Sequence, residues 1–218
     1  MNMHDAYQPV SMGTTLIGIK YSEGVVLAAD TLTSQGIFSA DRGALKINEL
    51  SPSVANFGSI KVMRCGNAAH SQRVTKMVKN YLTMHTMELN DQSKISMDTV
   101  LNLYRTICYG NKNFLSCAFI ISDGKDLASV SSSGVIVKHD LITFAGSGST
   151  YVNGFVKANT RPNMSFAEAR EVAIKAVSLA IDSDGGSGGN ARICNISNTG
   201  RSEMEVIDNK ELRDMVPA

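Results

Sequence analysis

The stretch Ser11-Met-Gly-Thr-Thr-Leu-Ile-Gly-Ile-Lys20 is followed closely by Val25-Val-Leu-Ala-Ala-Asp30. Loose alternation over Thr14 to Lys20 and an apolar run over Gly24 to Asp30 predict two short strands. A Gly-Thr pair in front of a strand is common and usually marks only a turn. Here two threonines follow the glycine and an acid ends the next strand, so these residues become informative if suitable partners lie downstream.

The rest of the chain continues as two helices, strands, two helices and strands. Further strands are expected over Leu45–Leu50, Ile60–Cys65, Ser116–Ser122, Ala128–Ser132, Val135–His139, Ile142–Ala145, Ala191–Ile196 and Met204–Ile207. Helices are expected over Ala68–Asn90 and Ser96–Tyr109, from near Ser149, and from the capping box Ser165-Phe-Ala-Glu168. This order predicts a single α+β domain in which helix layers cover antiparallel sheets, not a parallel βαβ wind.

Bulk composition restricts the classes of protein and site. The chain has 218 residues, 43% hydrophobic content and a net charge of +1, which indicates a globular protein and does not favour nucleic-acid or membrane-surface binding. No stretch approaches the apolar length of a transmembrane helix. The histidines are dispersed without metal-ligand spacing, so no metal site is expected. Free buried thiols in a reducing compartment are expected at Cys65, Cys108, Cys117 and Cys194.

Thr14 is the candidate nucleophile. A threonine hydroxyl reacts poorly unless a base is near, but cleavage between Gly13 and Thr14 would give Thr14 a free amine beside its own hydroxyl. With a reference pKa near ~8, that amine could accept the hydroxyl proton at neutral pH. Glycine before the bond suits self-cleavage because it has no Cβ.

Asp30 and Lys46 are the candidate charge partners. Asp30 closes the second strand, and Lys46 is expected inside the third, between Leu45 and Ile47. A positive charge near Thr14 would favour deprotonation of the hydroxyl, and Asp30 could hold the lysine in place. The alternative interpretation is an ordinary ion pair without a catalytic role.

Several ordered motifs carry a resemblance to a known family. They are Gly13-Thr-Thr-Leu-Ile-Gly, Gly24-Val-Val-Leu-Ala-Ala-Asp30, Lys46, Arg64-Cys-Gly-Asn-Ala-Ala69, Ala145-Gly-Ser-Gly-Ser149 and Asp184-Gly-Gly-Ser-Gly-Gly189. From about Gly13 to Ile207 the chain resembles the catalytic beta-type subunits of the proteasome core particle, which are N-terminal-nucleophile hydrolases.

The resemblance implies a fold and a set of roles. The fold would be a four-layer αββα sandwich, with residues 1–13 as a propeptide and residues 14–218 as the mature domain. Thr14 would be the N-terminal nucleophile, with Lys46 and Asp30 beside it. Ser147, Asp184 and Ser187 would surround the free amine. The backbone N–H of Gly66 would be the oxyanion donor. The segment Asp184 to Gly189 could otherwise be a flexible linker or a phosphate loop. It lacks the lysine-serine/threonine ending of a phosphate loop, which argues against phosphate binding.

Arg64 is the candidate specificity residue. By strand parity it shares a face with Ile60 and Val62, and a cation that faces inward needs a partner. A substrate carboxylate could be that partner. Alternatively, Arg64 could form an internal salt bridge, or its side chain could bend to solvent. In the family a basic residue here marks the caspase-like class, which cleaves after acidic residues. The small residues Gly66 and Ala68 would keep the pocket open.

The resemblance also implies the setting of the protein. Partners would be alpha-type and other beta-type subunits in stacked seven-membered rings, substrates would be unfolded polypeptides, and no cofactor would be needed. The location would be cytoplasmic and nuclear. Alternatives are a non-catalytic structural beta subunit, a bacterial-type ATP-dependent protease with an N-terminal threonine, and a binding module. Leu32 and the longer segment Asn48 to Ser59 depart from the family pattern near the expected cleft.

Overall fold

The computed structural model describes residues 13–35, 38–50, 59–88 and 95–217. Of the expected propeptide, only Gly13 is among these residues. Most of the longer segment between Asn48 and Ser59 also lies outside them, since residues 51–58 are not described.

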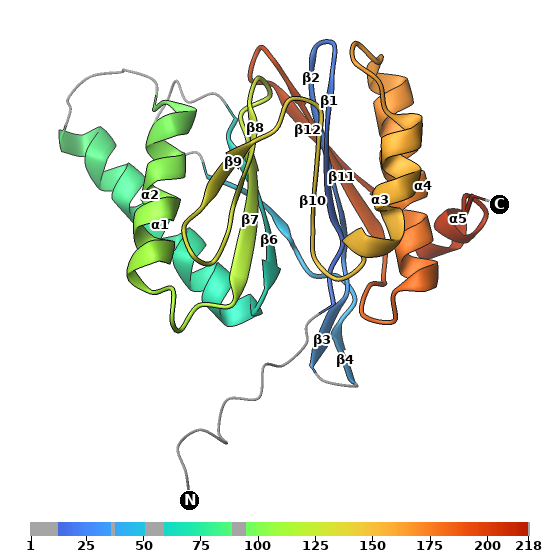
Figure 1. Cartoon of the computed structure of the whole chain (residues 1–218), viewed down its shortest axis with the longest axis horizontal. Coiled ribbons are helices and arrows are strands. Elements are labelled where there is room, and N and C mark those ends of the chain that lie inside the picture. The colour runs from blue at the N-terminus through green and yellow to red at the C-terminus, as the bar shows by residue number, and fades with distance from the viewer. Residues whose placement is uncertain (1–12, 36–37, 51–58, 89–94, 218) are drawn as a thin grey trace, which may run out of the picture.

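Two five-stranded antiparallel sheets form the centre of the molecule (Figure 1). The first sheet has the order β10-β1-β2-β11-β12 and consists of β1 (Leu16–Tyr21), β2 (Gly24–Asp30), β10 (Ile142–Ala145), β11 (Ala191–Ser197) and β12 (Ser202–Ile207). The second has the order β5-β6-β7-β8-β9 and consists of β5 (Ile47–Glu49), β6 (Lys61–Gly66), β7 (Cys117–Ser122), β8 (Leu127–Val130) and β9 (Ile136–Lys138).

Helices cover the outer face of each sheet. The long helices α1 (Ala68–Glu88) and α2 (Met97–Gly110) lie on the second sheet, and α3 (Ser149–Asn159) and α4 (Phe166–Ser183) lie on the first (Figure 1). The short helix α5 (Asn209–Arg213) packs beside α4. The layers are therefore helices, sheet, sheet and helices. The predicted α+β four-layer αββα sandwich is confirmed.

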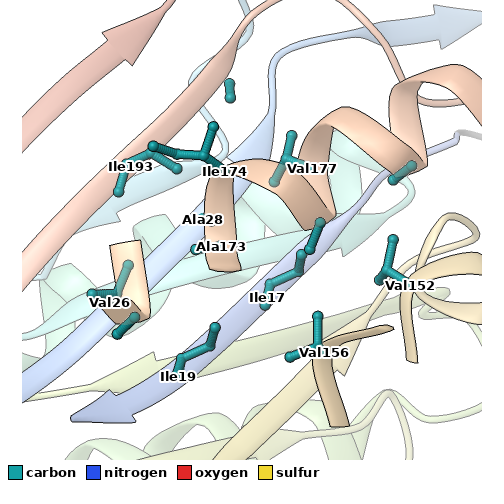
Figure 2. Packing of buried hydrophobic residues seen from close by; sticks show 14 of the residues in the cluster. Ile17, Ile19, Val26, Ala28, Val152, Val156, Ala173, Ile174, Val177 and Ile193 are labelled. Atoms are coloured by element: carbon teal, nitrogen blue, oxygen red, sulfur yellow. The ribbon is translucent and has the colours of Figure 1, made fainter. Parts of the chain in front are cut away.

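Apolar residues fill the spaces between the layers. Between the first sheet and α3 and α4, buried side chains such as Ile17, Val26, Val156 and Val177 interdigitate (Figure 2). A second cluster lies between α1, α2 and the other sheet, and a third, which includes Leu16 and Met63, lies between the sheets. Burial of this apolar surface is the main term that stabilises the layered arrangement.

The capping box predicted at the start of α4 is present. Ser165 caps α4 in a full capping box, because its side chain accepts from the backbone of Glu168 while the Glu168 side chain accepts from the backbone of Ser165. Ser96 caps α2 in a similar way through the N–H of Thr99. These caps satisfy backbone donors that a helix start otherwise leaves unpaired.

Three local predictions were wrong or incomplete. Lys46 precedes β5 instead of lying inside it, because β5 is an edge strand of three residues whose paired register begins at Ile47. A hairpin of β3 (Thr33–Gln35) and β4 (Phe38–Asp41) was not predicted. Neither was α5, which is too short to show helical periodicity.

No helix among the described residues has the length and apolar character needed to cross a membrane. Within the same residues, no group of three or more histidine, cysteine, aspartate or glutamate side chains could hold a metal ion.

Candidate active site

Thr14, Lys46 and Asp30 form one hydrogen-bonded row. The Lys46 Nζ donates to Thr14 Oγ1 at 3.0 Å and to Asp30 Oδ1 at 2.7 Å. The side chains are almost completely shielded from solvent, with exposed fractions of 4% for Thr14, 5% for Lys46 and 0% for Asp30. The structure therefore brings these three predicted residues together.

The two sheets position this row. Because β1 and β2 are antiparallel and pair Leu16 with Ala29, Thr14, two residues before β1, lies near Asp30 at the end of β2. Lys46 comes from the other sheet, directly before β5, and reaches across to both. The row thus joins the two sheets at one end of the sandwich.

Every acceptor position of the Asp30 carboxylate has a donor. Besides Lys46, the N–H of Thr15 donates to Oδ1 at 2.9 Å, and the N–H groups of Leu32 and Gly188 donate to Oδ2 at 3.2 and 3.1 Å. An ionised carboxylate offers about four acceptor sites, so four donors saturate it. Asp30 is consequently fixed in orientation, and it fixes the lysine.

Burial and the neighbouring acid act on Lys46 in opposite directions. Removal from water lowers the pKa of the Lys46 ammonium, because burial disfavours the charged form. The charge of Asp30 and its hydrogen bond raise that pKa, but the net direction is downward from 10.5. Lys46 therefore loses its proton more readily than an exposed lysine does.

A second set of side chains surrounds the nitrogen of Thr14. The Thr14 N–H donates to Ser147 Oγ at 3.2 Å, and Ser147 Oγ donates to Asp184 Oδ2 at 2.7 Å. Ser187 Oγ also donates to Asp184 Oδ2 at 2.7 Å. Ser147 lies just before α3 and Asp184 is the C-cap of α4, so the outer helix layer presents both to Thr14.

Gly13 fits a space that no other residue could occupy. A Cβ at this position would lie 2.1 Å from backbone atoms of Gly186, which is far inside van der Waals contact. The hydroxyl of Thr14 donates to the carbonyl oxygen of Gly13 at 2.6 Å. The Oγ1 atom therefore lies directly beside the Gly13–Thr14 peptide bond, the expected cleavage site.

The cysteines are unsuited to act as nucleophiles. All four are free and buried. Burial raises the pKa of the Cys65 thiol to about 11, although the charge of Lys46 acts to lower it. It also raises the pKa of Cys108 and Cys194 to about 11 and that of Cys117 to about 12. Thiolate is the reactive form, so these residues are inert at neutral pH.

Arg64 faces α1, as its predicted parity with Val62 requires. Its guanidinium donates to Leu45 O at 2.9 Å, to Asn48 Oδ1 at 3.3 Å and to Ser71 Oγ at 3.4 Å. All three acceptors are neutral, and among the described residues no ion pair includes Arg64. Burial lowers its pKa. A half-buried cation whose acceptors in the described part of the chain are all neutral suits an anionic group of a ligand.

The other predicted pocket residues follow Arg64 along the chain. Gly66 ends β6 with a φ of +83°, and Ala68 begins α1 and lies half-buried. Arg64 is linked to the row described above, because its own N–H donates to the Lys46 carbonyl at 3.2 Å. The oxyanion role of the Gly66 N–H stays a prediction.

Sequence reasoning missed three residues of this site. Thr15 contacts both polar networks, and Asn48 and Ser71 hold Arg64. The doubled threonine was a signal for Thr15, but nothing in the sequence shows which residues accept hydrogen bonds from an arginine.

A hollow of about 490 Å³ between α3, α4 and residues 214–217 contains none of these side chains.

Comparison with known proteins identifies relatives of this chain. A family model described as "Proteasome subunit" matches residues 10–196. The chain is 38% identical to the "Proteasome subunit beta type-6" of Arabidopsis thaliana, with 88% of this chain and 81% of the relative covered. It is 36% identical to the "Probable proteasome subunit beta type-1" of Schizosaccharomyces pombe, with 88% and 83% covered.

Proposed function

The chain belongs to the proteasome subunit family as a beta-type member, and we propose that it is a catalytic subunit whose nucleophile is Thr14. One observation carries the proposal. The buried Lys46 Nζ bridges Thr14 Oγ1 and Asp30 Oδ1. A structural subunit has no need of a buried cation directed at a hydroxyl, and an ion pair in this position costs desolvation energy.

Maturation would begin with attack of Thr14 Oγ on the carbonyl carbon of Gly13. The new C–O bond forms as the Gly13–Thr14 C–N bond breaks, and the proton lost by the hydroxyl is gained by the released amine. Hydrolysis of the resulting ester then frees Thr14 with its hydroxyl restored. The 2.6 Å contact between Thr14 Oγ1 and the Gly13 oxygen supports this step, since it holds the attacking atom beside its target.

Peptide hydrolysis would use the same atoms with the free amine as base. The amine takes the hydroxyl proton while the Lys46 ammonium stabilises the developing charge on Oγ. Oγ bonds to the substrate carbonyl carbon, the oxyanion is held by the Gly66 N–H, and the leaving amine takes the proton. Water then cleaves the ester. Ser147 and Asp184 hold the nitrogen in place throughout.

Cleavage after acidic residues is the proposed specificity. Arg64 lies one hydrogen bond from Lys46 and its guanidinium contacts only neutral acceptors among the described residues. A guanidinium can bind a carboxylate through two parallel hydrogen bonds. Aspartate or glutamate before the cut bond would therefore supply its counter-charge, which makes the caspase-like class the best match.

As a proteasome subunit the chain assembles with other proteasome subunits. The finer arrangement in stacked seven-membered rings of alpha-type and beta-type subunits, the unfolded polypeptide substrates, and the cytoplasmic and nuclear location are also proposals. They follow from the family likeness and not from contacts of this chain.

Peptide turnover by assembled particles tests the proposal. Wild-type particles and particles with Thr14→Ala would be assayed on fluorogenic peptides that end in an acidic, a basic or an apolar residue. Thr199→Ala is the matched control, because Thr199 is an exposed turn residue. The proposal predicts loss of acidic-peptide turnover in Thr14→Ala only. Unchanged turnover would instead make this chain a structural subunit.

A further inference from the structure

Thr15 forms hydrogen bonds with both groups of side chains around Thr14, the group at its hydroxyl and the group at its nitrogen. Its N–H donates to Asp30 Oδ1 at 2.9 Å, on the side of the Thr14 hydroxyl. Its own hydroxyl lies 2.7 Å from Ser187 Oγ, on the side of the Thr14 nitrogen. We propose that Thr15 is a positioning residue whose hydroxyl fixes the chain Ser187–Asp184–Ser147 that holds the nucleophile's nitrogen. This inference rests on the proposed function of Thr14.

Counting protons fixes the direction of these hydrogen bonds. Each serine hydroxyl has one proton, and the protons of Ser147 and Ser187 are both donated to Asp184 Oδ2. Ser187 Oγ can therefore only accept from Thr15, so the Thr15 hydroxyl is the donor. Ser147 Oγ can likewise only accept from the nitrogen of Thr14.

The result is a chain with one defined direction at every member. Thr15 donates to Ser187, and Ser187 donates to Asp184. From the other end, Thr14 N donates to Ser147, which donates to Asp184 as well. Asp184 is further held at Oδ1 by the Gly186 N–H at 3.1 Å. Thr15 thus supplies the terminal donor that sets the Ser187 rotamer and, through it, the position of the carboxylate.

The surroundings shield the Thr15 hydroxyl from solvent. Thr15 is 0% exposed and Ser187 6%, so solvent cannot replace a missing donor. A Cβ on Gly148 would lie 1.9 Å from Thr15 Oγ1 and 2.9 Å from Ser187 Oγ. The backbone of Gly148 therefore closes the network from the side of α3 and holds the hydroxyl against its acceptor.

The test compares three variants in assembled particles. Thr15→Val removes the hydroxyl with little change of shape, Thr15→Ser restores it, and Ser187→Ala removes its acceptor. Thr199→Val is the matched control, since Thr199 Oγ1 also lies 2.7 Å from a serine hydroxyl, that of Ser197, but in an exposed turn. Mass spectrometry gives the mature N-terminus, and turnover of an acidic peptide gives kcat and KM.

The positioning role predicts a particular pattern. Thr15→Val is processed at Thr14, its kcat falls about 3–10-fold, as expected for one lost hydrogen bond, and its KM is unchanged. Thr15→Ser and Thr199→Val keep the wild-type kcat. On a Ser187→Ala background, Thr15→Val causes no further loss, because the acceptor is already absent.

Other patterns overturn the inference. A wild-type kcat in Thr15→Val, an equal loss in Thr15→Ser, or full additivity with Ser187→Ala each shows that the hydroxyl does not act through Ser187. If Thr15→Val particles fail to assemble, Thr15→Ala is read by the same criteria, since it only removes atoms. Turnover that persists in Thr14→Ala would instead overturn the proposed function, whatever Thr15→Val does.

Discussion

Replacing Asp30 by asparagine separates the charge of this side chain from its shape. The carboxylate accepts from Lys46 and from the N–H groups of Thr15, Leu32 and Gly188. An amide has only one acceptor oxygen, so in Asp30→Asn two of these four donors face an NH₂ group instead. In either orientation Lys46 loses its counter-charge.

The expected loss of activity follows from the lost interaction. A hydrogen bond to a charged group contributes about 1.5–3 kcal/mol, which corresponds to roughly a 10–150-fold fall in turnover if Lys46 is no longer held against Thr14. The attraction of Asp30 also opposes the lowering of the Lys46 pKa by burial. In Asp30→Asn that pKa therefore falls further, and less of the lysine is charged at neutral pH.

The assay is acidic-peptide turnover by assembled particles over a range of pH. Asp41→Asn is the matched control, because Asp41 is exposed and its carboxylate accepts from the N–H of Gly43 in a turn. Equal turnover in Asp30→Asn and Asp41→Asn would show that the buried row contributes nothing to catalysis.

Three further predictions concern the same site. The pKa of Lys46 lies below 10.5 and the charged form contacts Thr14, so wild-type kcat/KM should fall as pH rises through a value below 10.5; an activity that stays level up to pH 10.5 contradicts this. Arg64→Leu should reduce turnover after acidic residues roughly 10–150-fold and favour apolar ones, whereas the exposed-site control Arg73→Leu should not; equal peptide preference in the two variants would exclude Arg64 from the pocket. Gly13→Ala should slow maturation, seen as uncut precursor by mass spectrometry, because its Cβ would overlap Gly186 at 2.1 Å. The control Gly43→Ala has 3.6 Å to its nearest atom, and normal maturation of both variants would contradict the steric argument.

The layered fold could be predicted because its signals are local. Alternating strands, helical periodicity and the Ser165–Glu168 capping box all depend on neighbours within a few residues, and their order implies helix-covered antiparallel sheets. The β3–β4 hairpin could not be predicted in this way. Its strands have three and four residues, which is too short for a period to emerge.

The site residues, too, could be predicted only in part. Thr14, Asp30 and Lys46 were found from the order of motifs, and the structure brings them into contact. The placement of Lys46 inside a strand was wrong, because the edge strand β5 begins one residue later. The doubled threonine was a signal for Thr15, but its hydrogen bond to Ser187, 172 residues away along the chain, could not be predicted from sequence.

The N-terminal sequence of this subunit in assembled, active particles decides whether Thr14 is the nucleophile. We expect a mature chain that begins at Thr14, because only cleavage after Gly13 gives the nucleophile its free amine. A subunit in active particles that still begins at Met1, or at any residue other than Thr14, would contradict the assignment of Thr14 as the N-terminal nucleophile.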